Sequence, residues 1–284
     1  MAYRKILTIQ DLSCVGQCSL TVALPILSAC GHETCVLPTT VLSTHTGGFT
    51  GYTCRDLTDD IPAVAAHWKK EGIRFEAVYT GYLGSSRQME MVKEIMDSEL
   101  LSGGLRIVDP AMADNGVLYP AFDAAYVEAM KSLTAVADIL LPNITEACLL
   151  THTPYREDVD EAFVHHLIDG LHAIGAKTVV LTGVGFTPEE TGVMISESGV
   201  CSYYRHRRLS QGCHGTGDVY ASAFVGAFMK GLDAYTAAKI AADFTLICME
   251  NTRGDLTHTY GVKFEPMLGT LMDMIRIARA MAAK

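Results

Sequence analysis

Apolar runs of strand length alternate with longer helical stretches along the whole chain. Several runs are almost continuously apolar, which is typical of strands covered on both faces. The predicted strands are Lys5–Gln10, Thr34–Leu37, Ala77–Tyr82, Leu105–Asp109, Asp138–Pro142 and Thr178–Thr182. The predicted helices are Leu20–Ala29, Ile61–Glu71, Arg87–Leu101 and Val159–Ile174, each followed by glycine, as left-handed C-terminal caps favour.

This alternation predicts an α/β fold with a mainly parallel sheet. The C-terminal part adds a predicted hairpin, with strands 192–196 and 201–204, and helices near 218–230, near 233–250 and from about 265. No linker-like tract interrupts the pattern, and 284 residues lie near the limit of about 250–300 for one hydrophobic core. We therefore expect a single domain over residues 1–284.

The charge balance narrows the class of partner. The net charge is −10, from 32 acidic residues against 22 Lys and Arg, and nucleic acids and anionic membranes both favour a basic face. We therefore expect small-molecule partners, without nucleic acid or membrane. The nine cysteines form no CxxC pair and no opening segment resembles a signal peptide, which predicts a cytoplasmic protein without a disulfide framework.

One segment carries the strongest chemical signal: Gly212–Asp218, which directly precedes an apolar helical run. Gly215 and Gly217 can adopt positive φ and expose backbone N–H groups, and the free N–H groups of a first helical turn attract anions such as phosphate. An acid at that place can take a proton from an alcohol while the N–H groups stabilise the transferring phosphoryl group. The alternative is that Asp218 merely caps the helix.

Polar residues also follow the predicted strands, where the ligand crevice of an open α/β sheet lies. The segments expected to converge there are 10–11, 80–82, 109–110, 142–146 and 182–183. Asp109, Asp114 and Glu146 supply oxygen ligands for a Mg²⁺ ion that keeps several waters near nucleotide phosphates. Asn143 and Glu146 equally fit a helix capping box, and the two roles are compatible. No Walker-type phosphate loop occurs.

Together these segments resemble the ribokinase-like superfamily and, within it, the pyridoxal (vitamin B6) kinases. The resemblance covers nearly the whole chain and is carried, in order, by Ile9-Gln10-Asp11, Leu42–Gly47, Thr80-Gly81-Tyr82-Leu83-Gly84-Ser85, Asp109–Asp114, Pro142-Asn143-Ile144-Thr145-Glu146 and Gly215-Thr216-Gly217-Asp218. The segments around His45-Thr46 and Gly81-Tyr82 point most directly to vitamin B6.

The resemblance implies a three-layer α/β/α sandwich, a homodimer, and ATP-dependent phosphorylation of the 5′-hydroxyl of pyridoxal, pyridoxine or pyridoxamine. Mg²⁺ and a monovalent cation are the implied ions. Asp218 would be the base and Gly215, Thr216 and Gly217 the anion hole. ATP would contact Asp109, Asn143, Thr182, Gly183, Cys213, Gly215 and Gly217; the metal group would be Asp109, Asp114 and Glu146; and the vitamin would contact Asp11, His45, Thr46, Tyr82 and Asp218.

Two departures leave alternatives open. Many family members carry serine where this chain has Asp11, so the ranking of vitamers is uncertain from sequence. Cys213-His214 is similar to the segment that precedes the glycine turn in hydroxymethylpyrimidine kinases of thiamine synthesis, which are the second candidate. A helix start favours the thiolate form of Cys213, close to either the vitamin or the adenine. A non-catalytic binder of pyridoxal phosphate is the third candidate.

Overall fold

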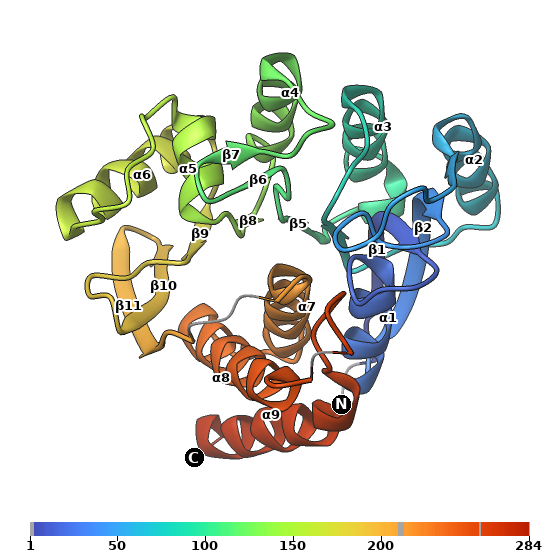
Figure 1. The fold of residues 1–284 in the computed structure, drawn as a ribbon. Coiled ribbons are helices and arrows are strands. Elements are labelled where there is room, and N and C mark those ends of the chain that lie inside the picture. Colours follow the sequence, from blue (N-terminus) through green and yellow to red (C-terminus); the bar gives the residue numbers. More distant parts are fainter. Residues whose placement is uncertain (1–2, 210–212, 256, 284) are drawn as a thin grey trace. The chain divides into compact units, whose positions relative to one another are not determined.

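The computed structural model describes residues 3–209, 213–255 and 257–283. The chain divides into two compact units, the first comprising Met1–Val64 with Leu209–Lys284 and the second Ala65–Arg208. Figure 1 shows the element order along the chain. Helix α2 (Ile61–Lys70) begins in the first unit and continues into the second. The expectation of one kinase domain over 1–284 stays a prediction.

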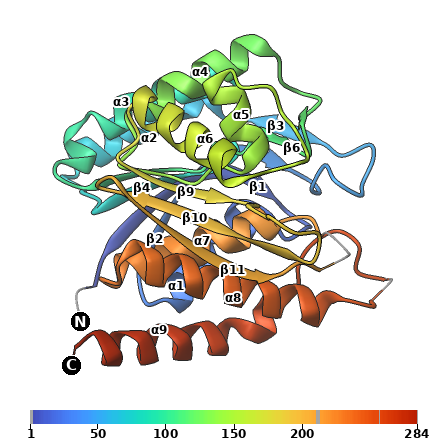
Figure 2. The ribbon, with the colours of Figure 1, turned by 90° about the vertical axis from the view of Figure 1, so that its left-hand side faces the viewer.

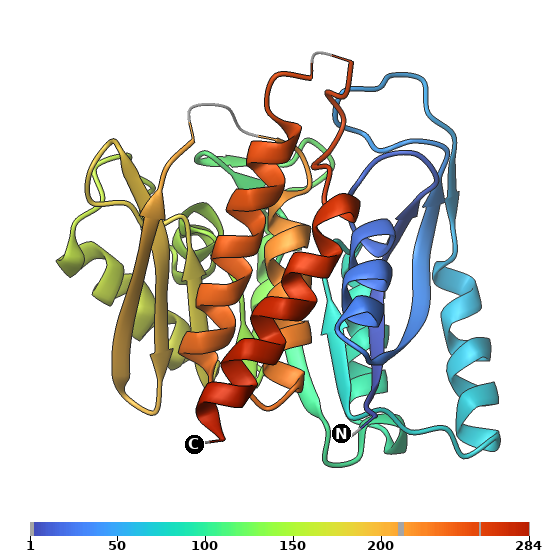
Figure 3. The ribbon, with the colours of Figure 1, turned by 90° about the horizontal axis from the view of Figure 1, so that it is seen from below.

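The first unit is built on a long parallel strand pair, β1 (Lys5–Ser13) and β2 (Glu33–Leu42), with the short β3 (Cys54–Asp56) antiparallel to β2. The register between β1 and β2 shifts between Gln10 and Leu12, so Asp11 lies at an irregularity of the strand. Four helices belong to this unit: α1 (Leu20–Ala29), α7 (Thr216–Met229), α8 (Ala234–Thr252) and α9 (Leu268–Ala282). Helices α8 and α9 lie side by side (Figure 3).

Ten residues of α7 are buried, among them Phe224, Val225 and several small side chains. This helix therefore forms much of the core of the first unit. The single-turn helices η1 (Thr58–Asp60) and η3 (Glu265–Met267) lead into α2 and α9, respectively. The C-terminal helix begins at Leu268, three residues later than the expected start.

The second unit holds a sheet in the order β11-β10-β9-β8-β5-β4. Four strands are parallel: β4 (Ala77–Thr80), β5 (Leu105–Val108), β8 (Ile139–Leu140) and β9 (Thr178–Thr182). The hairpin of β10 (Glu190–Glu197) and β11 (Val200–Arg207) is antiparallel. A separate small hairpin joins β6 (Ala113–Asp114) to β7 (Val117–Leu118).

Four helices cover one face of this sheet (Figure 2): α3 (Ser86–Met96), α4 (Ala124–Thr134), α5 (Ile144–Thr151) and α6 (Glu161–Ile174). The predicted helix Arg87–Leu101 is in fact α3 followed by the single turn η2 (Glu99–Leu101). Ser98 causes the break, because its hydroxyl donates to the Ile95 carbonyl oxygen and accepts from the Leu100 amide. The predicted helices do not include α4, and α5 is indicated only by its capping box at Asn143 and Glu146.

The predicted strands and the C-terminal hairpin are confirmed, with ends shifted by up to five residues. The glycines after the four predicted helices adopt positive φ, at 78° for Gly31, 69° for Gly72, 76° for Gly103 and 135° for Gly175. Within the described residues, no helix combines the length and the apolar character that crossing a membrane requires.

Candidate active site

The start of α7 is shaped by Gly215, the N-cap residue, whose φ is 77°. A Cβ added at Gly215 would overlap the carbonyl oxygen of Gln17, so only glycine fits this position. Gly217 is different: its φ is not positive, it lies inside the first turn, and a Cβ there would meet open space. Gly217 therefore does not adopt the positive φ that its residue type allows, and Gly212, the first residue of the motif, lies outside the described residues.

Asp218 is the third residue of α7, so its interpretation as the N-cap is wrong. The carboxylate is half-buried, and the backbone N–H of Ser19 is near enough to act on its pKa. Burial raises the pKa of Asp218 to about 7; the nearby Asp11 charge raises it too, whereas the Ser19 N–H lowers it. A carboxyl group with a pKa near neutrality can both accept and release a proton at physiological pH.

Asp11 is brought near Asp218 by the β1 irregularity. Its side chain is buried, and the Ser13 hydroxyl donates to Oδ2 at 3.2 Å. Burial raises the pKa of Asp11, and hydrogen bonds from Ser19 and Ser13 oppose that rise. Cys18 completes the cluster: burial and then the charges of Asp218 and Asp11 raise the pKa of its thiol. The first unit therefore holds two desolvated carboxyl groups beside a glycine turn.

The thiol of Cys213 is half-buried, and burial raises its pKa. The expectation of a stabilised thiolate is therefore wrong, because desolvation outweighs the helix start. Thr216 Oγ1 donates to the Cys213 carbonyl oxygen at 3.3 Å, which anchors the turn.

His45 and His214 form an imidazole pair, with ring centroids 5.5 Å apart in an edge-on arrangement. Burial, and then the His214 charge, lower the pKa of His45, so its ring is neutral at physiological pH. Two glycines make room for this pair: a Cβ at Gly16 would lie 2.7 Å from His45 Cβ, and one at Gly47 would lie 2.9 Å from both rings. Thr46 is exposed beside them.

In the second unit the carboxyl ends of the parallel strands meet, as predicted. The Asp109 amide donates to the Thr80 carbonyl oxygen at 3.0 Å, and the Thr182 amide donates to that of Pro142 at 2.9 Å. Asn143 and Thr182 form an isolated parallel bridge. Gly183 follows with φ 75° and open space where a Cβ would stand. The structure thus brings Asp109, Asn143 and Thr182-Gly183 to the same sheet edge.

Glu146 lies in a complete capping box at the start of α5. Its Oε2 accepts from the Asn143 amide at 2.8 Å, Asn143 Oδ1 accepts from the Glu146 amide at 2.9 Å, and Glu146 Oε1 accepts from the Met112 amide at 3.1 Å. The capping interpretation is confirmed. Burial raises the pKa of Glu146 to about 7, the backbone donors oppose this, and the Asp114 charge adds to it.

Asp114 is exposed in the β6–β7 hairpin, where its Oδ1 accepts from the Asn115 amide at 2.9 Å. Over residues 3–209, 213–255 and 257–283, no three His, Cys, Asp or Glu side chains form a group that could hold a metal ion. The structure does not bring Asp109, Asp114 and Glu146 together as one such group.

Tyr82 follows β4 and is half-buried. Its ring lies 5.3 Å from that of Phe122, which stacks on Tyr126 at 3.6 Å between centroids. The Tyr126 hydroxyl donates to the Leu83 carbonyl oxygen at 2.6 Å, which anchors one end of this aromatic stack.

The sequence profile of the phosphomethylpyrimidine kinase family matches residues 26–262 of this chain. The chain belongs to this family. A Bacteroides thetaiotaomicron protein, provisionally described as a phosphomethylpyrimidine kinase and solved with pyridoxal, is 35% identical over 95% of this chain and 96% of its own, with a TM-score of 0.89. The pyridoxal kinase of Lactobacillus plantarum is 33% identical over 96% and 98% of the two chains, with a TM-score of 0.88.

These likenesses confirm the predicted ribokinase-like α/β fold. Among curated relatives, the pyridoxine kinase of Bacillus subtilis (strain 168) is 27% identical over 179 residues. That alignment covers 61% of this chain and 64% of the relative, a little under two thirds of its length. The family contains kinases of both vitamin B6 and thiamine precursors by description, so the family alone leaves the acceptor open.

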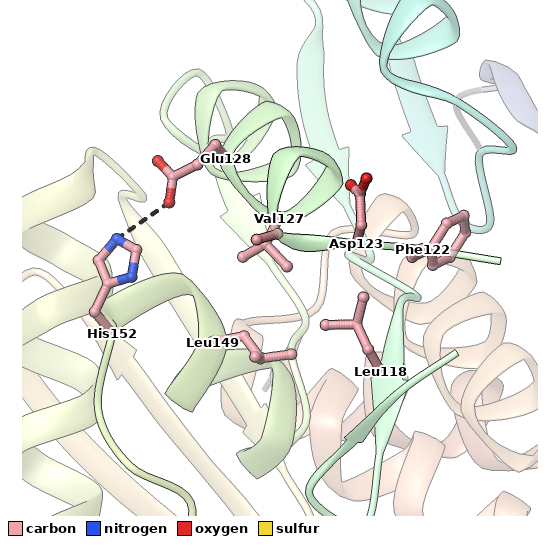
Figure 4. Close-up of a pocket in the computed structure, with 8 residues that line it drawn as sticks. Leu118, Phe122, Asp123, Val127, Glu128, Leu149 and His152 are labelled. Atoms are coloured by element: carbon pink, nitrogen blue, oxygen red, sulfur yellow. Dashed lines mark ion pairs between the residues drawn. The ribbon is translucent and has the colours of Figure 1, made fainter. Parts of the chain in front are cut away.

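One cavity of the second unit is lined by none of the predicted site residues, although Phe122, which packs on Tyr82, is part of its wall. It has a volume of about 320 Å³ and is lined by Leu118, Phe122, Asp123, Ala124, Val127, Glu128, Leu149 and His152. Its polar groups are already used, since His152 Nε2 pairs with Glu128 Oε1 at 3.3 Å (Figure 4) and Asp123 accepts from the Tyr126 amide. We therefore assign this cavity no part in the chemistry.

Sequence reasoning missed three contributors to the site. Ser19 shows no motif signal, because a serine before a helix resembles an ordinary N-cap. Gln17 matters through its carbonyl oxygen, which any residue type supplies. Phe122 belongs to a segment between short elements, and only the fold places it against Tyr82.

Proposed function

We propose that this protein is a pyridoxal kinase, which transfers the γ-phosphoryl group of ATP to the 5′-hydroxyl of pyridoxal, pyridoxine or pyridoxamine. The observation that carries the proposal is the environment of Asp218. A carboxyl group with a pKa of about 7 stands one helical turn from free N–H groups at an obligatory glycine. A non-catalytic binder does not require a base in this position.

In the proposed reaction, the Asp218 carboxylate accepts the proton of the 5′-hydroxyl as the oxygen attacks the γ-phosphorus. The amides of Gly215, Thr216 and Gly217 donate to the oxygens of the transferring group, and the open space at Gly217 lets that group approach the backbone. Asp11, His45, Thr46 and Tyr82 bind and orient the vitamin ring. Neutral His45 can accept from or donate to a ring substituent without adding charge.

We assign Asp109, Asn143, Thr182, Gly183 and Cys213 to ATP. Asn143 is held by its Nδ2, which donates to the Ala113 carbonyl oxygen at 2.8 Å, and Gly183 leaves the backbone accessible. Asp109, Asp114 and Glu146 would hold a largely hydrated Mg²⁺, Glu146 through water. When bound, Mg²⁺ neutralises charge on the β- and γ-phosphates.

The second candidate is hydroxymethylpyrimidine kinase, which the family match favours. ADP release should be measured with ATP and Mg²⁺ against pyridoxal, pyridoxine, pyridoxamine and hydroxymethylpyrimidine, with Asp218→Asn as the control. We expect ADP release with at least one B6 vitamer at a kcat/KM above that with hydroxymethylpyrimidine. A higher kcat/KM with hydroxymethylpyrimidine would make the pyrimidine the acceptor. Binding of pyridoxal phosphate without any ADP release would support the non-catalytic binder instead.

We further propose a cytoplasmic homodimer. All nine cysteines are free, which fits a reducing compartment. The dimer rests on the family resemblance and is tested by light scattering after gel filtration, where a mass near 30.7 kDa would contradict it.

A further inference from the structure

The loop between β2 and β3 is anchored by the backbone only near its ends. The Ser43 amide donates to the Thr53 carbonyl oxygen at 3.0 Å, but in the described chain the segment 48–52 forms no backbone–backbone hydrogen bond. Gly48 and Gly51 adopt positive φ, 85° and 70°, and bring no side chain to pack. The position of this segment therefore depends on the packing of its other side chains.

Phe49 provides that packing. Its half-buried ring lies against the ring of Tyr260, with centroids 5.4 Å apart and planes inclined by 43°. A Cβ added at Gly48 would lie 3.9 Å from Tyr260 Cβ, so the backbone beside Phe49 contacts the same residue. The Tyr260 ring is in turn covered by His258, at 4.3 Å between centroids. Tyr260 thus contacts two consecutive residues of the loop.

The segment that carries Tyr260 is itself fixed within the first unit. Gly261 forms a parallel bridge with Gln17, and a Cβ there would lie 2.9 Å from the Gln17 backbone nitrogen, so this approach requires glycine. The Lys263 amide donates to Thr252 Oγ1, at the end of α8, at 2.8 Å. Tyr260 therefore offers Phe49 a fixed support.

The other side of the same loop borders the imidazole pair. A Cβ added at Gly47 would lie 2.9 Å from atoms of both the His45 and the His214 rings. Gly47 is separated from Phe49 by a single residue, so movement of Phe49 away from Tyr260 would shift the backbone that lies against the two imidazoles.

We propose that Tyr260 is a positioning residue for vitamin binding, whose ring holds Phe49 and so keeps Gly47 against His45 and His214. The ligand in this inference, the vitamin, rests on the proposed function, whereas the support of Phe49 by Tyr260 does not. Aromatic pairs stabilise by an amount that corresponds to about a two- to tenfold change in an equilibrium constant.

Three variants isolate the ring contact. Tyr260→Leu keeps an apolar side chain but removes the ring, Tyr260→Phe keeps the ring, and Phe49→Leu removes the partner. Phe228→Leu is the matched control, because Phe228 is half-buried in the same unit and its ring stacks on that of Phe224 at 5.7 Å.

We expect Tyr260→Leu to raise the KM for the vitamin by about three- to tenfold, with kcat and the KM for ATP within about twofold of the parent. Tyr260→Phe should match the parent. The double variant Tyr260→Leu/Phe49→Leu should raise the KM no further than the larger single effect, because both changes remove the same contact. Phe228→Leu should lower Tm and leave the KM for the vitamin unchanged.

A measurement without turnover tests the support itself. Cleavage of a native protein at one segment follows the local opening of that segment. Chymotrypsin cleavage after Phe49, measured by mass spectrometry relative to total cleavage, should be about threefold or more faster in Tyr260→Leu. Tyr260→Phe and Phe228→Leu should keep the parental ratio. The Kd for pyridoxal, measured by calorimetry, should rise in Tyr260→Leu alone among these three variants.

A parental KM for the vitamin in Tyr260→Leu would overturn the inference, and so would parental cleavage after Phe49. Single effects that multiply in the double variant would show that Tyr260 and Phe49 act independently, which also overturns it. If the parent protein phosphorylates none of the vitamers, the proposed function fails, and the cleavage ratios and the pyridoxal Kd still decide the role of Tyr260.

Discussion

Asp218, which is half-buried, and Glu146, which is buried, are carboxyl groups near helix starts in different units, and desolvation raises the pKa of each to about 7. Their hydrogen bonding differs. Both oxygens of Glu146 accept backbone N–H bonds, and the residue is 3% exposed. Asp218 is half-buried and follows a glycine turn, and the one backbone N–H that acts on its pKa is that of Ser19. Two carboxyl groups with a similar pKa can therefore differ in role, one being structural and the other able to act as a base. The number of backbone N–H groups that act on the carboxylate distinguishes the two.

Replacing each acid by its amide is the strongest test of this comparison. Asp218→Asn should lower kcat by about 10²–10⁴, the usual contribution of a positioned base, with the KM for ATP little changed. Glu146→Gln should lower kcat far less and raise the Mg²⁺ concentration needed for half-maximal rate. Steady-state kinetics with Mg²⁺ titrations measure both. Near-parental kcat in Asp218→Asn would reduce Asp218 to a structural acid.

The two glycines of the turn sharpen the comparison next. Gly215→Ala should lower the free energy of unfolding by on the order of 3 kcal/mol, because a Cβ combines an unfavourable φ with overlap on the Gln17 carbonyl oxygen. Gly217→Ala should leave stability equal or higher, since its φ is ordinary and no atom lies within 4 Å. Urea unfolding measures both. Equal losses in the two variants would contradict the assigned geometry.

Asp218 and Glu146 should contribute stability that is lost as pH rises between about 4 and 7, while His32, whose pKa burial lowers to about 4, contributes the opposite trend. Both acids have folded-state pKa values near 7, above their ordinary values of 3.8 and 4.5, so in this window the unfolded chain releases protons that the folded chain keeps. Their contribution to the free energy of unfolding should decrease through this window and level off above pH 7. Urea unfolding across this range is the measurement, and Glu146→Gln should flatten the slope. An unchanged slope in Glu146→Gln would show that this carboxyl group is not desolvated.

The smallest effect concerns the aromatic stack of the second unit. Phe122→Leu removes the ring that supports Tyr82, and aromatic pairs contribute about 0.5–1.5 kcal/mol. We expect a roughly three- to tenfold higher KM for the vitamin, with kcat and the KM for ATP unchanged. Phe186→Leu, whose ring packs on Tyr203 at 5.1 Å, is the control. Equal KM values in parent and Phe122→Leu would remove Tyr82 from the vitamin site.

The sequence by itself determined the features that depend on residues close together in the chain. Apolar runs predict the strands because a buried strand needs few further contacts to be recognisable, and Thr178–Thr182 and Leu20–Ala29 match their observed bounds. The capping box of Asn143 and Glu146 is a relation between residues three apart, so the chain order contains it. The apolar pattern does not predict helix α5, because most of its side chains are buried and the helix therefore lacks an amphipathic period.

Only the tertiary structure decided the chemistry of the acids. The pKa of Asp218 depends on Asp11 and Ser19, some two hundred residues away in the chain, and that of Cys213 on burial that no local motif encodes. Residue 215 is glycine because a Cβ there would overlap the carbonyl oxygen of Gln17. Every residue type has such a carbonyl oxygen, so the identity of residue 17 does not reveal this contact. Desolvation and charge interactions depend on distances in space, and a sequence specifies these only through the complete fold.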